Sequence, residues 1–107
     1  MRHDFAFIKS NKRLIKLRFD EVVFIKGLGN YVEIAISSGE KYVYYRSLKE
    51  LINTLPEDFM RIHNSYIVNL AHVDSFEDNH ITLKNLKIRV PKSYKDCVDS
   101  AIAKIML

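Results

Sequence analysis

The side chains best suited to binding a metal ion or attacking a carbonyl carbon are His63, His72, His80, Cys97 and Ser65. Structural zinc sites use ligands in close pairs at short fixed intervals, and these residues lie too far apart along the chain for that. No glycines flank Ser65 to form a nucleophile elbow, and Cys97 falls in an apolar-rich turn of a predicted helix, where cysteine usually packs as a small hydrophobic side chain. The sequence therefore predicts no metal, no cofactor and no enzymatic activity.

A second set of polar side chains is suited to hydrogen bonding with another molecule. The run Arg61–Asn69 interleaves polar with apolar residues, so a strand there would use both faces. The triplet His63-Asn64-Ser65 indicates a turn or bulge, which either aims these side chains outwards or is ordinary turn chemistry. Lys92, Ser93 and Lys95 begin a predicted C-terminal helix, where they form either a phosphate seat or a solvated cap.

These residues belong to a chain of 107 residues, enough for one compact domain over 1–107 with one core. Apolar residues make up 48% and charged residues 28%, a composition typical of a folded, soluble domain. The net charge of +4 favours an anionic partner such as nucleic acid. A single cysteine and the absence of any membrane-length apolar run predict a cytoplasmic protein that does not enter a membrane.

Alternation of apolar and polar residues predicts a mostly β fold. The first predicted strands are Arg13–Phe19, Val22–Ile25, Tyr31–Ile36 and Lys41–Arg46, with turns at 27–30 and 37–40. Val22–Ile25 is β-branched and aromatic throughout, so we expect it to be buried on both faces. The later predicted strands lie within 59–70, at 73–76, and at 81–83 and 87–90, the last two joined across Asn85-Leu86.

Two helices complete the predicted fold. Apolar residues at helical spacing follow Ser47, which forms a capping-box pattern with Glu50, and Pro56 supplies the stop. Ser93 with Asp96 is predicted to cap a C-terminal helix, whose apolar face comprises Val98, Ala101, Ile102 and Ile105.

The tyrosines Tyr42, Tyr44 and Tyr45 cluster in one predicted strand. They could form a base-stacking platform for single-stranded RNA, because any base can stack on an aromatic face. Tyrosine is also a favoured strand residue, and cross-strand packing is the commoner reason for such a cluster. We therefore favour packing over stacking.

Three blocks of the sequence resemble the LytTR family of bacterial DNA-binding domains. They are "DEVVFIKGLGNYVEI", "YYRSLKELINTLPEDFMRIHNSYIVNL" and "ITLKNLKIRVPKSYKDCV", in that order. The middle block is the most specific, because it follows the family pattern F-x-R-x-H-x-S-x-x-V-N at Phe59, Arg61, His63, Ser65, Val68 and Asn69. The resemblance covers roughly residues 5–102.

This resemblance implies an elongated fold of packed antiparallel sheets with one short internal helix. It further implies the C-terminal output domain of a two-component response regulator, preceded by a receiver domain in the full-length chain. Members of the family commonly bind direct repeats in double-stranded promoter DNA as two copies, so a homodimer on DNA is expected. Loops, and not a recognition helix, enter the DNA grooves.

Carried over position by position, the resemblance implies three DNA-facing segments. The first is the turn from Lys26 to Tyr31, including Asn30, whose side chains would hold the loop against phosphates. The second is His63-Asn64, and the third is the segment around Lys92-Ser93. These residues are the predicted DNA-binding set: Lys26, Asn30, Tyr31, His63, Asn64, Lys92 and Ser93.

Side-chain chemistry assigns expected roles within this set. The carboxamide of Asn64 matches the N7 and N6 edge of adenine in the major groove, so Asn64 is the first choice for base readout. Lys92 would reach guanine or only a phosphate. Arg61 would brace the loop from behind and His63 would orient Asn64.

Two further residues of the middle block, Ser65 and Asn69, are expected to be structural, because polar side chains in irregular β regions often satisfy local backbone groups.

One segment departs from the family pattern. The chain reads "VPKSYKD", whereas many relatives place the proline two residues earlier and a serine at the position of Pro91, which leaves the alignment of Lys92 open by one residue. Two alternatives to duplex DNA binding also stay open. One is a protein-interaction module that docks a partner on its loops and on the 42–45 strand, and the other is the single-strand RNA platform.

Overall fold

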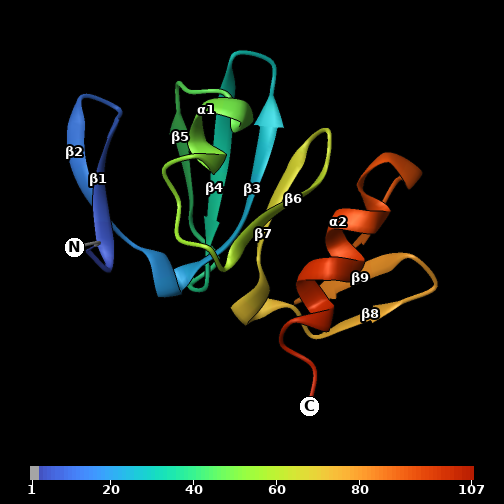
Figure 1. Cartoon of the computed structure of the whole chain (residues 1–107). Helices are drawn as coiled ribbons and strands as arrows, with labels where there is room; N and C mark the ends of the chain where they lie inside the picture. Colours follow the sequence, from blue (N-terminus) through green and yellow to red (C-terminus); the bar gives the residue numbers. More distant parts are fainter. Residues whose placement is uncertain (1–2) are drawn as a thin grey trace.

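The structure, a computed structural model, describes residues 3–107 and contains three antiparallel sheets (Figure 1). A two-stranded ribbon is formed by β1 (Phe5–Ser10) and β2 (Arg13–Arg18). The described part of the chain spans 41 × 31 × 25 Å, so the sheets lie side by side along an elongated molecule. This confirms the predicted fold class of packed antiparallel sheets.

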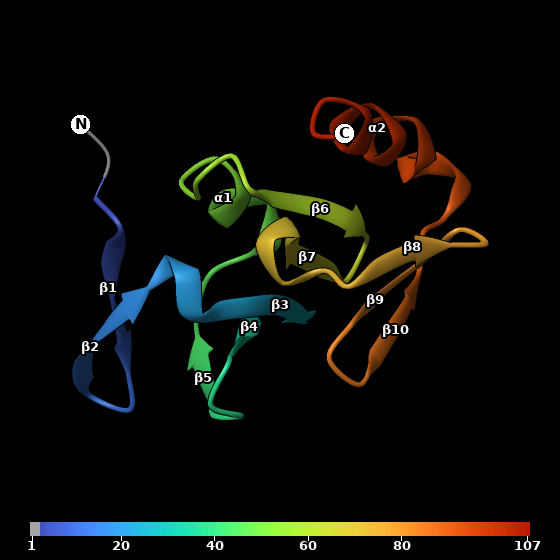
Figure 2. The same ribbon diagram turned by 90° about the horizontal axis from the view of Figure 1, so that it is seen from below.

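The central sheet has five strands in the order β5-β4-β3-β7-β6. Its members are β3 (Val22–Leu28), β4 (Tyr31–Ile36), β5 (Lys41–Tyr44), β6 (Phe59–His63) and β7 (Tyr66–Asn69). The third sheet comprises β8 (Ser75–Glu77), β9 (His80–Leu83) and β10 (Leu86–Arg89). The helices are α1 (Leu48–Ile52) and α2 (Lys92–Ala103), with 3-10 turns η1 (Phe19–Glu21) and η2 (Leu70–His72). Figure 2 shows the central sheet between the ribbon on one side and the third sheet with α2 on the other.

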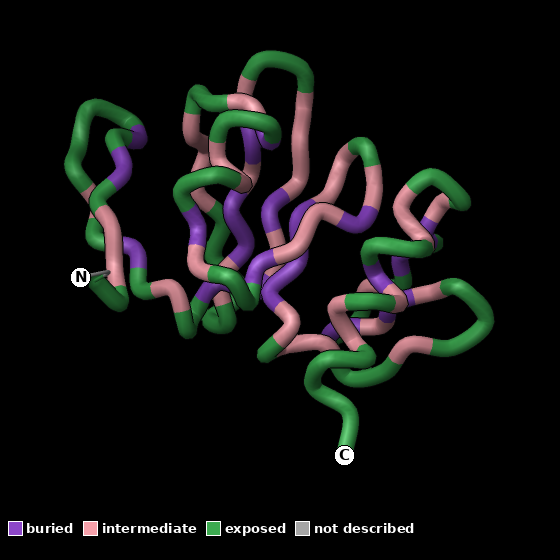
Figure 3. The backbone as a smooth tube through the Cα atoms, viewed as in Figure 1, coloured by how far each residue is buried: buried purple, intermediate pink, exposed green. Residues whose placement is uncertain are grey.

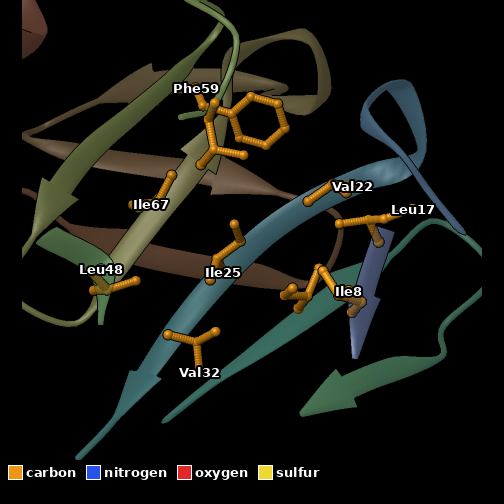
Figure 4. Packing of buried hydrophobic residues seen from close by; sticks show 10 residues of the cluster. Ile8, Leu17, Val22, Ile25, Val32, Leu48, Phe59 and Ile67 are labelled. Atoms are coloured by element: carbon orange, nitrogen blue, oxygen red, sulfur yellow. The ribbon is translucent and has the colours of Figure 1, made fainter. Parts of the chain in front are cut away.

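Strand β3 joins two hydrophobic cores because its side chains point to both faces of the sheet, and a register shift between Val22 and Phe24 interrupts the strict alternation. Val22 and Ile25 belong to a cluster that includes the ribbon and α1, while Val23 belongs to a cluster that includes β9, β10 and α2. All three side chains are at most 1% exposed, which confirms the prediction that this segment is buried on both faces. Figure 4 shows the first cluster, and Figure 3 shows buried stretches in the ribbon, in the central sheet and in the third sheet with α2.

Helix α1 packs on the sheet where a strand residue lacks a side chain. A Cβ atom on Gly27 would lie 3.1 Å from Cδ1 and 3.2 Å from Cγ of Leu48, so the glycine allows the buried leucine to approach the sheet. The predicted capping box is present: Ser47 Oγ accepts from the Glu50 amide at 3.2 Å, and Glu50 Oε1 accepts from the Ser47 amide at 3.1 Å. This pair fixes the start of the helix.

We expect Ser47→Ala to lower the free energy of unfolding by about 1 kcal/mol, the usual cost of losing an N-cap side chain. Hydrogen bonds from the backbone and side chain of Ser47 hold the pKa of Glu50 below its ordinary value. A carboxylate with a lowered pKa stabilises the fold above its unfolded-state pKa, and this contribution disappears as pH falls through the folded-state pKa. Urea titrations should therefore show a wild-type advantage at neutral pH that shrinks in acid. An advantage that grows on acidification would contradict the capping role.

Several boundaries differ from the sequence-based expectations. β1 was not predicted, and β3 extends to Leu28, so the predicted loop at 26–31 is only the two-residue turn Gly29–Asn30. The turn between β9 and β10 lies at Lys84–Asn85, one residue earlier than expected. Lys84 has a positive φ of 51°, a value that strand residues do not adopt, so the β9–β10 ladder ends at Leu83 and the turn begins at Lys84.

Helix α2 also begins differently from the expectation. Its N-cap is Pro91, without a side-chain hydrogen bond, so the predicted cap at Ser93 is wrong. The fixed φ of proline, here −65°, and a bond from the Tyr94 amide to the Pro91 carbonyl at 2.9 Å start the helix at Lys92. Val98 is buried as predicted, but Ile105 lies beyond the helix and is 67% exposed. Cys97 is exposed, so it does not pack as a core residue.

Candidate nucleic-acid interface

The three predicted DNA-facing segments lie at one end of the molecule, at the top in Figure 1. They are the β3–β4 turn at Gly29–Asn30, the β6–β7 turn at Asn64–Ser65 and the start of α2 at Lys92–Ser93. We call these three segments together the turn end. All three tips contain exposed residues (Figure 3). The antiparallel hairpins and the adjacent helix thus bring together segments that lie more than 60 positions apart in the chain.

The side chain of Arg61 holds the β6–β7 turn through hydrogen bonds to its backbone. A register shift between Arg61 and His63 breaks the regular ladder, as expected for a bulge. The Arg61 guanidinium donates from Nη2 to the Asn64 carbonyl at 2.8 Å and from Nε to the His63 carbonyl at 3.4 Å. His63 Nδ1 accepts from the Ser65 amide at 3.0 Å. The turn is therefore fixed by its own side chains, and the predicted bracing role of Arg61 is confirmed.

Asn64 is exposed at the tip of this turn, and its carboxamide is oriented by a residue of α2. The Tyr94 hydroxyl donates to Asn64 Oδ1 at 2.9 Å. A carboxamide oxygen has two lone pairs, so this bond leaves one acceptor site and both N–H donors of the amide free. Those groups remain available for a bidentate contact with a second molecule. Tyr94 was not predicted as a site residue, because nothing in the sequence signals a contact across 30 positions.

The β3–β4 turn is tied to the β6–β7 turn through the backbone. The Gly27 amide donates to the Ser65 carbonyl at 2.8 Å, and β3 pairs with β7 up to Lys26 opposite Tyr66. Lys26 therefore lies within a strand and not in a loop, a correction to the expectation. Its Nζ lies 6.0 Å from the centroid of the Tyr66 ring, at the edge of the cation–π range.

The tip of the β3–β4 hairpin presents Asn30. Gly29 has a φ of 71°, which glycine adopts without strain, and this allows a two-residue turn. Tyr31, the first residue of β4, is half-buried, and its ring centroid lies 5.6 Å from that of Tyr45. Asn30 is exposed, whereas Tyr31 is partly covered by this aromatic contact.

The start of α2 supplies one unpaired cation to the turn end. Lys92 and Ser93 are exposed, and no hydrogen bond or ion pair engages either side chain within residues 3–107. Lys95 behaves differently, because its Nζ lies 2.8 Å from Asp99 Oδ2, and the hydrogen bond to that carboxylate raises the pKa of Lys95. Of the phosphate seat considered from the sequence, Lys92 and Ser93 remain available, whereas the positive charge of Lys95 is already paired with Asp99.

The other polar residues singled out in the sequence have structural positions. Asn69 is 2% exposed, and its amide nitrogen donates to the carbonyls of Val22 at 2.9 Å and Phe19 at 3.2 Å. Its Oδ1 accepts from the Ala71 amide at 3.0 Å, so every group of this side chain serves the fold. The structural role predicted for Asn69 is confirmed.

The side chains considered for metal binding are dispersed. His72 Nε2 contacts the Asp20 carbonyl at 2.7 Å, and His80 Nδ1 contacts the Asp78 carbonyl at 2.8 Å. Within residues 3–107 no three His, Cys, Asp or Glu side chains gather closely enough to hold a metal ion.

The tyrosines Tyr42 and Tyr44 pack against the first core cluster, in agreement with the packing interpretation, while Tyr45 is 65% exposed. No helix among the described residues is long and apolar enough to span a bilayer.

The fold is that of a β-sheet DNA-binding domain. The structure superposes on the solved LytTr DNA-binding domain of a Bacillus cereus protein assigned as a methyl-accepting/DNA response regulator, with a TM-score of 0.80 and 21% sequence identity over 94% of this chain and 98% of that one. The sequence profile of the LytTr DNA-binding domain matches residues 12–102. The chain therefore belongs to the LytTr family of DNA-binding domains. A comparison with curated proteins finds no match.

Proposed function

We propose that this LytTr domain recognises specific double-stranded DNA sites by inserting its turns into the grooves, and that it regulates transcription as the output domain of a two-component response regulator. The observation that carries the proposal is the carboxamide of Asn64, exposed on a turn braced by Arg61 and oriented by Tyr94. A hydrogen-bonding group held rigidly at an exposed tip loses little freedom on binding, so it can discriminate between base edges.

Most of the other predicted DNA-binding residues are assigned to contacts with the sugar-phosphate backbone of DNA. Lys92 carries a free positive charge and Ser93 a hydroxyl at the first turn of α2, where the helix dipole also favours a phosphate. Asn30 and Tyr31 lie on the neighbouring hairpin, and Lys26 lies one strand position behind the Gly27–Ser65 link. His63 is assigned to positioning, because its Nδ1 is occupied by the Ser65 amide.

The proposal includes the partners that the family resemblance implies. In the proposed full-length protein a receiver domain controls the LytTr domain, and two copies bind direct repeats in a promoter, with a homodimer forming on the DNA. We propose that the protein acts in the cytoplasm, where promoter DNA lies, and that the domain binds DNA without catalysis.

Duplex sites selected from a random library by the wild-type protein test the proposal directly. Fluorescence anisotropy should give an affinity that falls steeply as salt rises from about 50 to 200 mM, because phosphate contacts release counterions. Lys26→Ala should weaken binding to selected and scrambled duplexes alike, since its contact reads no base. Lys104→Ala, at the C-cap of α2, is the charge-matched control. Failure to enrich any sequence from the library would contradict sequence-specific recognition.

Tyr94→Phe tests the orientation of the Asn64 side chain while Asn64 itself is kept. The variant keeps the aromatic ring but loses the hydroxyl that donates to Asn64 Oδ1. We expect the preference for selected over scrambled duplex to fall about threefold to tenfold, the equivalent of a hydrogen bond of roughly 1 kcal/mol. Binding to scrambled duplex should stay unchanged. The Asn64 side-chain amide signal in NMR spectra should also shift, and an unchanged signal together with an unchanged preference would contradict the orienting role.

A further inference from the structure

The positive charge of the chain is concentrated in the β1–β2 ribbon, outside the three predicted DNA-facing segments. Residues 5–18 contain five cations and no carboxylate, whereas residues 19–107 contain 11 of the 17 Lys and Arg and 12 of the 13 Asp and Glu. The ribbon therefore accounts for the net positive charge of the whole chain. Those five cations are Lys9, Lys12, Arg13, Lys16 and Arg18.

Two of these cations, Lys9 and Lys12, line a groove between the ribbon and the end of β5. The groove is lined by Lys9, Asn11, Lys12, Tyr44, Tyr45 and Arg46, and we call it the basic groove. It has three cations and no carboxylate in its lining. The cations are exposed, so all three can meet a ligand at the surface.

The fold holds the walls of the basic groove in place. Ser10 is 4% exposed, and its Oγ donates to the Val43 carbonyl at 2.7 Å, which anchors the tip of the ribbon to β5. Asn11 and Lys12 have φ values of 51° and 65°, so the ribbon closes in a tight turn beside this anchor. On the opposite wall, the Arg46 guanidinium lies 5.4 Å from the centroid of the Tyr44 ring and donates to the Tyr45 carbonyl at 3.1 Å.

One carboxylate interacts with this cluster from outside the groove. Glu50 experiences the charge of Arg46, but Glu50 Oε1 already accepts from the Ser47 amide and hydroxyl in the capping box. The guanidinium of Arg46 has five N–H donors, and among residues 3–107 it makes one hydrogen bond, to the Tyr45 carbonyl, so donors remain for a ligand. The groove keeps a net positive charge when Glu50 is counted.

The basic groove is continuous with the turn end. Tyr45 lines the groove, and its ring lies 5.6 Å from that of Tyr31 at the base of the β3–β4 turn. The ribbon turn and the end of β5 point to the same side of the molecule as the turn end in Figure 1. A duplex lying across the turn end can therefore continue over Tyr45 towards Lys9 and Lys12.

We propose that the basic groove binds the phosphodiester backbone of the DNA duplex on one flank of the site read by the turns. Lys9, Lys12 and Arg46 contact phosphates there, and Tyr45 packs against the sugar edge. The proposal rests on the duplex binding proposed above and extends its footprint to one side only. These contacts add affinity and read no bases, because phosphates are the same in every sequence.

The test compares a triple variant, Lys9→Gln, Lys12→Gln and Arg46→Gln, with a charge-matched control, Lys87→Gln, Arg89→Gln and Lys104→Gln. The control residues lie on β10 and at the end of α2. The probe is a selected duplex that extends beyond the site by about 10 base pairs, one helical turn, on each side. For the groove variant we expect the slope of log affinity against log salt to fall by about 0.9 for each phosphate that the protein no longer neutralises. Its preference for selected over scrambled duplex should stay at the wild-type value.

Trimming one flank of the duplex at a time locates the groove on the DNA. Removal of the flank over the groove should weaken wild-type binding by on the order of tenfold and leave the groove variant unaffected, because that variant no longer binds those phosphates. Thermal melts verify that all variants are folded. Equal salt slopes for the groove variant and the control, with wild-type binding intact, would overturn the groove proposal alone. Absence of any wild-type binding to duplex would overturn the proposed function and the groove with it.

Discussion

Asn64→Ala is expected to lose about 1 to 3 kcal/mol of discrimination between the selected duplex and a scrambled one, because a bidentate contact to a base edge contributes about that much. The side chain is exposed, and its only hydrogen bond within residues 3–107 is the one accepted from Tyr94. Its removal leaves intact the hydrogen bonds that the Arg61 guanidinium donates to the backbone carbonyls of His63 and Asn64. The free energy of unfolding should therefore change little, and the effect should appear in binding alone.

The measurement is a competition titration of the selected and scrambled duplexes at fixed salt, where a loss of about tenfold to a hundredfold in preference is expected. Asn85→Ala is the matched control, since Asn85 is also an exposed asparagine in a hairpin turn but belongs to the third sheet. A preference in Asn64→Ala equal to that of Asn85→Ala would remove Asn64 as the base-reading residue. The salt slope should be unchanged in both variants, because neither loses a phosphate-binding cation.

Asn69→Ala is expected to lower the free energy of unfolding by about 2 to 4 kcal/mol, since it leaves buried backbone groups without partners. The asparagine satisfies the carbonyls of Phe19 and Val22 and the amide of Ala71. It thereby joins the start of β3 to the end of β7, two strands that run beside each other in the central sheet. The cost exceeds that of an ordinary surface change because water cannot replace a side chain that is 2% exposed.

Urea denaturation of Asn69→Ala should show a lower midpoint, and its melting temperature should fall by roughly 4 to 8 °C for each kcal/mol lost. Asn53→Ala is the control, because Asn53 is exposed and its side chain makes a single hydrogen bond within residues 3–107, to the Lys49 carbonyl at 3.4 Å. A melting temperature of Asn69→Ala within a degree or two of the Asn53→Ala value would contradict the structural role. DNA preference of the folded fraction should be unaffected.

Local patterns in the sequence predicted those parts of the fold that depend on neighbouring residues. The capping box of Ser47 and Glu50 acts over three positions, and the β-branched and aromatic run at Val22–Ile25 indicates a segment buried on both faces. The interruption at His63–Ser65 was predicted for the same reason, because polar turn residues between two apolar runs mark a reversal of the chain. Strand β1 was not predicted because its residue types do not alternate as its burial does: the apolar Phe7 is 57% exposed and the polar Ser10 is 4% exposed.

The sequence by itself determined a mostly β fold with two helices and a polar interruption at His63–Ser65, and the resemblance of its motifs to the LytTR family implied that this turn faces DNA. The tertiary structure alone decided that Lys26 lies in a strand, that Tyr94 orients Asn64 and that Ser10 anchors the basic groove to β5. The last two contacts join residues 30 and 33 positions apart. Such contacts depend on how separate elements pack in three dimensions, and a one-dimensional pattern carries no record of that packing.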